Sequence, residues 1–589
     1  MVIVFLVNLL LLLGQDSSNW NTLAEASNYR KTCSYADVVA YYERMRAASP
    51  WVIVQQIGTT PEGRDMTLVV ISKDKAFTPQ AAVKTSKAVL LVVNGVHSGE
   101  IEGKDACMAL ARDICITKER QSLLDHVILV ILPVFNIDGH ERTSPYNRIN
   151  QNGPDEMGWR CTARNLNLNR DYMKADAVEM QAFLRVFHAW RPHLWFDTHT
   201  TDGADFQYDI TFGAATGPEN APSVADYVNN SLHPHLLKTL AQDGHIPMLF
   251  FEMRDRLDPS KGVDTNLGFA PRFSTGYGAI MNRPSILVET HMLKPYDARV
   301  RATYNLLKRT IELVNADPEA LRSAVRHGDE YSASLARDAK KRTVLTTTQP
   351  AKDDGVPMIF RAYAVDSNRS AASGAVYPVW NHAKPIDVPS RQFSMTEVAR
   401  DVTLPSSYIV PAPWTDVIER LELHGLLLER LSEPQSFDVA SYRFTDVRWK
   451  ERPFEGRHEV SYKVEPIRET RHFPKGSVIV KLNHPNAVVA AHLLEPEAPD
   501  SLVHWGFFDP IFEQKEYYED YAMAPIADRM LSLNAGLKKD FDDWLKSNPN
   551  KAGNPRARLD FIHQRSPYWD HRKDVYPVGR IEQHDPQTP

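Results

Sequence analysis

Residues 87–100 read KAVLLVVNGVHSGE, and this stretch decides the fold class. Its first part, Lys87 to Val93, is a short continuous apolar run, typical of a strand buried on both faces. A turn that contains Gly95 follows, and apolar residues then recur with helical spacing across residues 101–114. A buried strand that passes through a turn into a helix is the basic unit of an α/β sheet.

The same alternation continues along the chain. Apolar runs predict further strands at 126–134, 193–196 and 284–288, and helical spacing predicts helices at 176–190 and 300–314. We therefore predict an α/β domain over residues 27–330, with a mixed, mostly parallel central sheet and helices on both faces. In such sheets, ligands bind outside the carboxyl ends of the strands.

A second region follows a polar stretch at 326–354, which indicates a boundary. Alternating Val, Tyr, Phe and Thr at 436–482 predict antiparallel strands, and helical spacing recurs near 414–429 and 517–546. We predict a C-terminal α+β or β-rich region over 331–589, which could divide into subdomains 355–435 and 436–589.

Composition excludes several classes of protein. Hydrophobic residues make up 43% and charged residues 24%, which excludes a disordered or collagen-like chain. The net charge of −6 argues against nucleic acid as a partner, because such binding needs a basic surface. Four cysteines exclude a scaffold held by disulfides. Cys107 and Cys115 lie too far apart on one predicted helix to pair, whereas a pair of Cys33 with Cys161 stays open.

The N-terminal segment Val2–Leu13 is apolar apart from Asn8. It is too short to span a bilayer, which needs about 20 residues, but suits the apolar core of an export signal. No basic residue precedes it, and the triplet Ala24-Glu25-Ala26 lies farther downstream than a cleavage site normally does. We predict a leader over 1–26 and a periplasmic or secreted protein, with a cytoplasmic location as the alternative. No later apolar run is long enough to span a membrane.

A candidate metal site begins with His97 and Glu100, an H-x-x-E pair that follows the strand directly. Imidazole and carboxylate are both zinc ligands, and this spacing lets both reach one ion from a turn that enters a helix. The pair alone is a weak signal, because the chain contains five H-x-x-[DE] pairs. His199, at the end of another predicted strand, is the candidate third ligand. The alternative for His199 is a core histidine with satisfied hydrogen bonds.

Further motifs stand at the ends of the other predicted strands. They are N-x-D-G at 136–139, Trp159-Arg160, Leu168-Asn169-Arg170, and the acid Glu289 after an apolar run. In this order, the motifs resemble those of zinc carboxypeptidases of the carboxypeptidase A type, across about residues 40–320. The long C-terminal extension is similar to that of large bacterial members.

The resemblance implies a role for each matched residue. His97, Glu100 and His199 would bind one Zn2+ per chain, and Glu289 would be the general base. Arg160 would polarise the scissile carbonyl, while Asn169 and Arg170 would bind the terminal carboxylate of the substrate. The predicted function is a zinc metallocarboxypeptidase that removes C-terminal residues from peptides or proteins by attack of zinc-bound water.

The chain also departs from the family pattern. Asn167 stands where the family commonly has an Asp that supports a zinc-binding histidine, so the histidine would gain an acceptor without charge. Tyr277 is a weak candidate for the family's substrate-capping tyrosine. The preferred substrate side chain, the oligomeric state and the role of 331–589 stay open.

Two other functions would suit the same residues. One is a zinc amidase or deacylase that acts on N-acyl amino acids or cell-wall peptides, against which only the carboxylate-binding residues argue. The other is a non-catalytic peptide-binding protein on the same fold, against which the full set of ligands and Glu289 argues.

Overall fold

The computed structural model describes residues 20–266, 270–338, 340–350 and 352–582. The apolar segment Val2–Leu13 lies outside the described residues. Residues 20–26, which we assigned to the leader, pack on the first domain: Trp20 and Ala24 are buried, and Ala24 belongs to α2 (Leu23–Ala26). The described residues include no helix long and apolar enough to cross a membrane.

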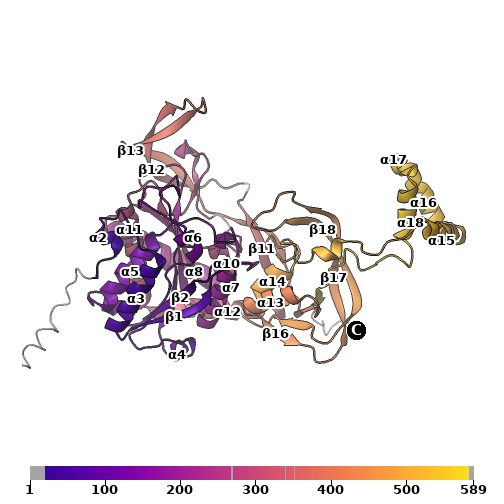
Figure 1. Ribbon diagram of the computed structural model, residues 1–589, viewed down its shortest axis with the longest axis horizontal. Helices are drawn as coiled ribbons and strands as arrows, with labels where there is room; N and C mark the ends of the chain where they lie inside the picture. Colours follow the sequence, from indigo (N-terminus) through magenta and orange to yellow (C-terminus); the bar gives the residue numbers. More distant parts are fainter. Residues whose placement is uncertain (1–19, 267–269, 339, 351, 583–589) are drawn as a thin grey trace, which may run out of the picture.

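An eight-stranded sheet forms the centre of the first domain (Figure 1). Its spatial order is β1 (Val52–Thr59), β2 (Asp65–Ile71), β4 (Val127–Leu132), β3 (Ala88–Val93), β5 (Leu194–Thr201), β10 (Ser285–His291), β6 (Ile210–Gly213) and β7 (Pro247–Leu249). The pairs β3–β4, β3–β5, β5–β10 and β6–β7 are parallel, and the other three are antiparallel. The sheet is thus mixed and mostly parallel, as predicted.

The sequence of β3 is continuously apolar because both faces of this strand are buried. Leu90 and Val92 belong to one buried cluster, whereas Val89, Leu91 and Val93 belong to another. The first cluster includes residues of α3 (Tyr35–Ala48), α5 (Glu102–Cys115), α9 (His233–Gln242), α11 (Tyr296–Ala316) and α12 (Pro318–Ser334). The second includes residues of α7 (Val178–Trp190) and α10 (Ser274–Ile280). Because side chains alternate between faces, a strand covered on both faces needs apolar residues throughout.

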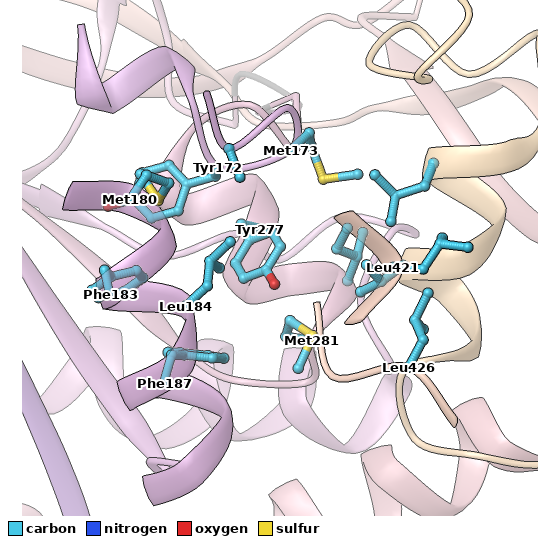
Figure 2. Packing of buried hydrophobic residues seen from close by; sticks show 14 of the residues in the cluster. Tyr172, Met173, Met180, Phe183, Leu184, Phe187, Tyr277, Met281, Leu421 and Leu426 are labelled. Atoms are coloured by element: carbon cyan, nitrogen blue, oxygen red, sulfur yellow. The ribbon is translucent and has the colours of Figure 1, made fainter. Parts of the chain in front are cut away.

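The C-terminal region contains one six-stranded sheet, in the order β16 (Leu427–Arg430), β19 (Val478–Lys481), β15 (Ser407–Val410), β20 (Gly579–Ile581), β17 (Gln435–Trp449) and β18 (Val460–Phe473). This sheet crosses the division we expected at residue 436, because β15 pairs with β19 and β20. With α13 (Thr415–Leu423) and α14 (Ala487–Leu494), it shares the second buried cluster with the first domain. Figure 2 shows this junction, where Leu421 and Leu426 approach Tyr277 and Met281.

Residues 356–393 form a long hairpin of β12 (Val356–Arg369) and β13 (Val376–Phe393). The hairpin joins β8 (Glu252–Met253) and β9 (Val263–Asp264) of the first domain rather than the C-terminal sheet. Between the two regions, α12 continues through part of the polar stretch, and β11 (Thr343–Thr348) pairs with β14 (Glu397–Val402). The polar boundary is therefore largely structured.

A small helical unit projects from the C-terminal region (Figure 1). It consists of α15 (Asp520–Leu533), α16 (Ala535–Ser547), α17 (Pro549–Ala552) and α18 (Pro555–His563). These helices enclose a buried cluster of their own that includes Met523, Phe541 and Phe561. The four cysteines of the chain are free thiols, so Cys33 and Cys161 do not pair.

Candidate metal centre and active site

His97, Glu100 and His199 meet at the carboxyl ends of two parallel strands. His97 follows β3 through the turn at Gly95, whose φ is 63°, and Glu100 precedes α5. His199 lies near the end of β5, which pairs with β3. The three side chains are buried, and their potential ligand atoms all lie within 4.8 Å of one another.

Both imidazoles turn the same nitrogen toward Glu100. His97 Nδ1 lies 3.2 Å from Glu100 Oε1, and His199 Nδ1 lies 3.0 Å from Glu100 Oε2. The opposite nitrogens face other groups: His97 Nε2 lies 3.0 Å from Asn167 Oδ1, and His199 Nε2 lies 2.9 Å from Asp197 Oδ2. Asn167 thus supplies the uncharged acceptor that its place in the sequence predicts.

This arrangement fits a zinc ion. Ligand atoms about 2.1 Å from one ion in tetrahedral geometry would lie roughly 3.4 Å apart, close to the separations between these side chains. His97 Nδ1 is buried and has no hydrogen-bond partner in the described residues, which suits a nitrogen that binds a cation. Two imidazoles and one carboxylate are also a common protein ligand set for catalytic zinc.

The protonation of two of these side chains suits a cation. Burial lowers the pKa of His97 to about 4, so this imidazole is neutral near pH 7. Burial alone would raise the pKa of Glu100, but the charge of Arg148 and a hydrogen bond with His199 hold it well below its usual range. Metal binding requires deprotonated ligands, and His97 and Glu100 are already in that state.

Glu289 lies beside His199 because β10 and β5 pair in parallel with these two residues in register. Its Oε2 is buried and has no hydrogen-bond partner in the described part of the chain. Burial raises the pKa of Glu289 well above its usual range, although His199 opposes this effect. Glu289 is therefore a carboxylate with a high affinity for a proton.

The other predicted residues lie around this centre. Arg160 Nη1 lies 3.5 Å from Glu100 Oε1, and 42% of the Arg160 side chain is exposed. Asn169 Nδ2 lies 3.4 Å from His199 Nε2, and Asn169 Oδ1 is buried without a hydrogen-bond partner. Arg170 lies over the Phe273 ring, 4.3 Å from its centre, and donates to the Asn169 carbonyl.

Arg170 does not pair with the adjacent Asp171, which was the structural alternative to a substrate-binding role. Asp171 is buried and forms its ion pair with Lys174. Within the described residues, Arg170 forms no ion pair, and it lines the cavity. A guanidinium without an acidic partner beside a cavity is suited to bind a carboxylate ligand.

One cavity of about 500 Å3 brings all seven predicted residues together. The remaining walls are mainly apolar or hydroxylic, with Phe250, Phe273, Leu287 and Met292 among them. Asp202 and Glu252 add acidic groups to the lining.

Sequence reasoning missed two residues that contact the ligands. Arg148 Nη2 donates to Glu100 Oε1 at 2.5 Å from an irregular loop, for which the sequence carries no signal. Asp197 contacts His199 and precedes it by two residues on β5. That spacing puts both side chains on one face of the strand, so it could have indicated Asp197.

Tyr277 is not a substrate cap. It is fully buried outside the cavity lining, and its hydroxyl lies 3.1 Å from His188 Nε2 and 2.8 Å from His424 Nδ1. Because His424 belongs to the C-terminal region, Tyr277 connects the two regions (Figure 2).

Residues 38–202 match the family described as zinc carboxypeptidase. Carboxypeptidase 2 of Trichophyton rubrum is 23% identical over 501 residues, which cover 81% of this chain and 85% of the relative. Similar solved structures include a putative carboxypeptidase A from Shewanella denitrificans (20% identity, 47% of this chain, 69% of that chain, TM-score 0.34). Another is carboxypeptidase A from Helicoverpa armigera, with 18% identity and a TM-score of 0.34; the match covers 51% of this chain and 74% of that chain. The matched segment contains His97, Glu100 and His199, so the part of the chain that carries the candidate metal centre is similar to the zinc carboxypeptidase family.

Proposed function

We propose that this protein removes C-terminal residues from peptides or proteins, with one zinc ion per chain held by His97, Glu100 and His199. The observation that carries the proposal is the common cavity. It combines a metal-binding cluster, an unpartnered carboxylate oxygen of Glu289, and the guanidinium of Arg170. These are the groups needed to activate water and to bind a terminal carboxylate.

A zinc ion supplies Lewis acidity, which lowers the pKa of water from 15.7 to about 7 and polarises a carbonyl. Glu289 Oε2 accepts the proton of the attacking water. The carboxyl group then passes that proton to the departing amine nitrogen. Arg160 reaches the cavity from a half-exposed position and donates hydrogen bonds to the oxygen that gains charge on the scissile carbonyl.

Asn169 and Arg170 determine which bond is cut. Arg170 binds the terminal carboxylate through its guanidinium fork, and Asn169 adds a hydrogen bond from its amide. Fixing the end of the peptide beside Glu289 places the last peptide bond at the reacting groups.

We also propose that the protein is exported. The segment Val2–Leu13 supports this location, and a leader would have to end before Trp20, because Trp20 packs in the first domain.

The test is to follow cleavage of a peptide library by mass spectrometry and to measure the zinc content of the same protein preparations. We expect one zinc per chain and loss of single C-terminal residues. Glu289→Gln should keep the zinc and lower kcat by about 10³-fold, because it removes the proton acceptor. One zinc with cleavage of N-acyl amino acids but no C-terminal trimming would support an amidase or deacylase instead. Binding of peptides without turnover would indicate a non-catalytic protein.

A further inference from the structure

The hairpin formed by β17 and β18 reaches from the C-terminal region to the loop of the first domain that carries Asn169 and Arg170. At its tip, Phe454 and Arg457 pair through their backbones, with N···O distances of 2.8 and 3.1 Å. Between them, Glu455 has a φ of 50° and Gly456 a φ of 81°. Two consecutive residues with positive φ define a type I′ turn, which favours Asn, Asp or Gly at its first central position. Glu455 is therefore an unfavourable residue for the turn itself.

Contacts on both sides hold this tip in place. Arg457 binds Asp176 of the first domain, with N···O distances of 2.6 and 2.8 Å. The ring of Phe454 stacks on Trp505, with 6.2 Å between ring centres. The tip is thus fixed between the two regions, and its position does not depend on Glu455 alone.

Glu455 contacts the loop that carries the substrate-binding residues. Its Oε2 accepts a hydrogen bond from the Asn167 backbone N–H at 3.0 Å. Asn167 Oδ1 lies 3.0 Å from both the Asn169 backbone nitrogen and His97 Nε2. One hydrogen-bond chain therefore connects the C-terminal region with a metal ligand and with the site that would bind the substrate carboxylate.

The loop needs such support because it has little regular structure. Only Leu168–Arg170 forms a short 3-10 turn, and Asn169 departs from helical geometry within it. Burial lowers the pKa of Arg170, and the negative charge of Glu455 opposes this effect. An unfavourable turn residue that makes a specific contact at an active site indicates a function for that residue.

We propose that Glu455 is a positioning residue, through which the C-terminal region sets the conformation of the loop Asn167–Arg170. This inference rests on the proposed function of that loop, and it assigns a role to part of residues 331–589. The C-terminal region thereby completes the substrate site of the first domain.

The test uses the full-length, zinc-loaded protein and the substitution Glu455→Asn. Asn suits the positive φ of the turn, so it preserves or stabilises the hairpin, but its side chain is too short to reach Asn167. The matched control is Glu451→Asn, an exposed position near the hairpin tip. Amide hydrogen exchange of peptides covering 162–172 measures how well the loop is ordered. KM and kcat for a peptide with a free C-terminus measure substrate binding and turnover at the active site.

We expect Glu455→Asn to speed exchange in the loop about 10-fold and to raise KM about 10-fold, because a hydrogen bond to a charged group is lost. The thermal midpoint should not fall, and kcat should change by less than about twofold. Glu455→Gln keeps an acceptor of the right length and should restore most of both losses. The control should leave both quantities unchanged.

Unchanged exchange and KM in Glu455→Asn would overturn the proposal, as would equal effects of Glu451→Asn. A purely structural role of Glu455 predicts a lower thermal midpoint with loop exchange and KM unaffected, which would also overturn it. If the wild-type protein shows no peptidase activity, the proposed function fails. The exchange measurement still decides whether Glu455 orders the loop.

Discussion

The two halves of the active site are built in different ways. Of the candidate metal ligands, His199 stands on β5 of the central sheet, and His97 and Glu100 lie in the short turn that connects the neighbouring parallel strand β3 with α5. Asn169 and Arg170 stand on a loop whose conformation depends on side-chain contacts, one of them from a residue 288 positions away. The sheet therefore determines the metal centre, whereas the substrate-binding loop depends on the rest of the chain.

This difference means that the two halves should respond separately to substitution. A change in the loop should alter peptide binding without changing zinc affinity, and a change beside a metal ligand should do the reverse. Asn167 is the exception, because it contacts His97 and also the loop.

Among the substitutions that separate the two halves, the largest effect is expected for Arg170→Ala. Loss of the guanidinium removes the partner of a charged carboxylate, so kcat/KM for peptides should fall by about 10²- to 10³-fold. Zinc content should stay at the wild-type level. Arg164→Ala, an exposed arginine nearby, is the control for loss of charge. Equal cleavage of free and amidated C-termini by the wild-type protein would show that Arg170 does not bind the carboxylate.

A smaller effect is expected for Asp197→Asn, which acts on the metal centre. Asp197 Oδ2 lies 2.9 Å from His199 Nε2, and its charge supports this imidazole as a ligand. Zinc affinity, measured by competition with a chelator, should fall by about 10- to 100-fold. KM of the zinc-loaded variant should stay within about twofold. Asp226→Asn makes the same chemical change at an exposed site, and if it weakened zinc binding as much, the effect would not belong to Asp197.

The smallest effect is expected for Asn167→Asp, at the residue shared by both halves. Aspartate would give His97 Nε2 a charged acceptor, so the protein should retain zinc at least as well after dialysis. Measured zinc content below that of the wild type would contradict this. A changed KM in this variant would show that the two halves are coupled through Asn167.

Much of the central sheet could be predicted because its signals are local. The apolar runs that became β3 and β4 each contribute alternate residues to two buried clusters, which is the pattern of a strand covered on both faces. His97, His199 and Glu289 directly follow or end such runs, so their meeting at one edge follows from the parallel arrangement of the strands. The helix predicted at 101–114 is α5, shifted by one residue.

Other features could not be predicted because they depend on distant partners. The predicted helix at 414–429 ends at Leu423, since Gly425 adopts a φ of 63° and β16 follows to pair with β19. The polar residues of α12 do not mark a domain boundary as predicted. They belong to a helix whose other face packs on the first domain. The burial of Tyr277 depends on His424, and the contact of Glu455 depends on the hairpin that carries it.

The position of β20 has a consequence for how the chain folds during synthesis. Residues 579–581 lie between β15 and β17 in the middle of the six-stranded sheet. The ribosome releases β15, β17, β18 and β19 well before it releases this strand, so the sheet stays divided until residue 581 has emerged. The helical unit α15–α18 has a buried cluster of its own and can fold during that delay. A premature stop before Gly579 would therefore remove a central strand and leave two unpaired edges.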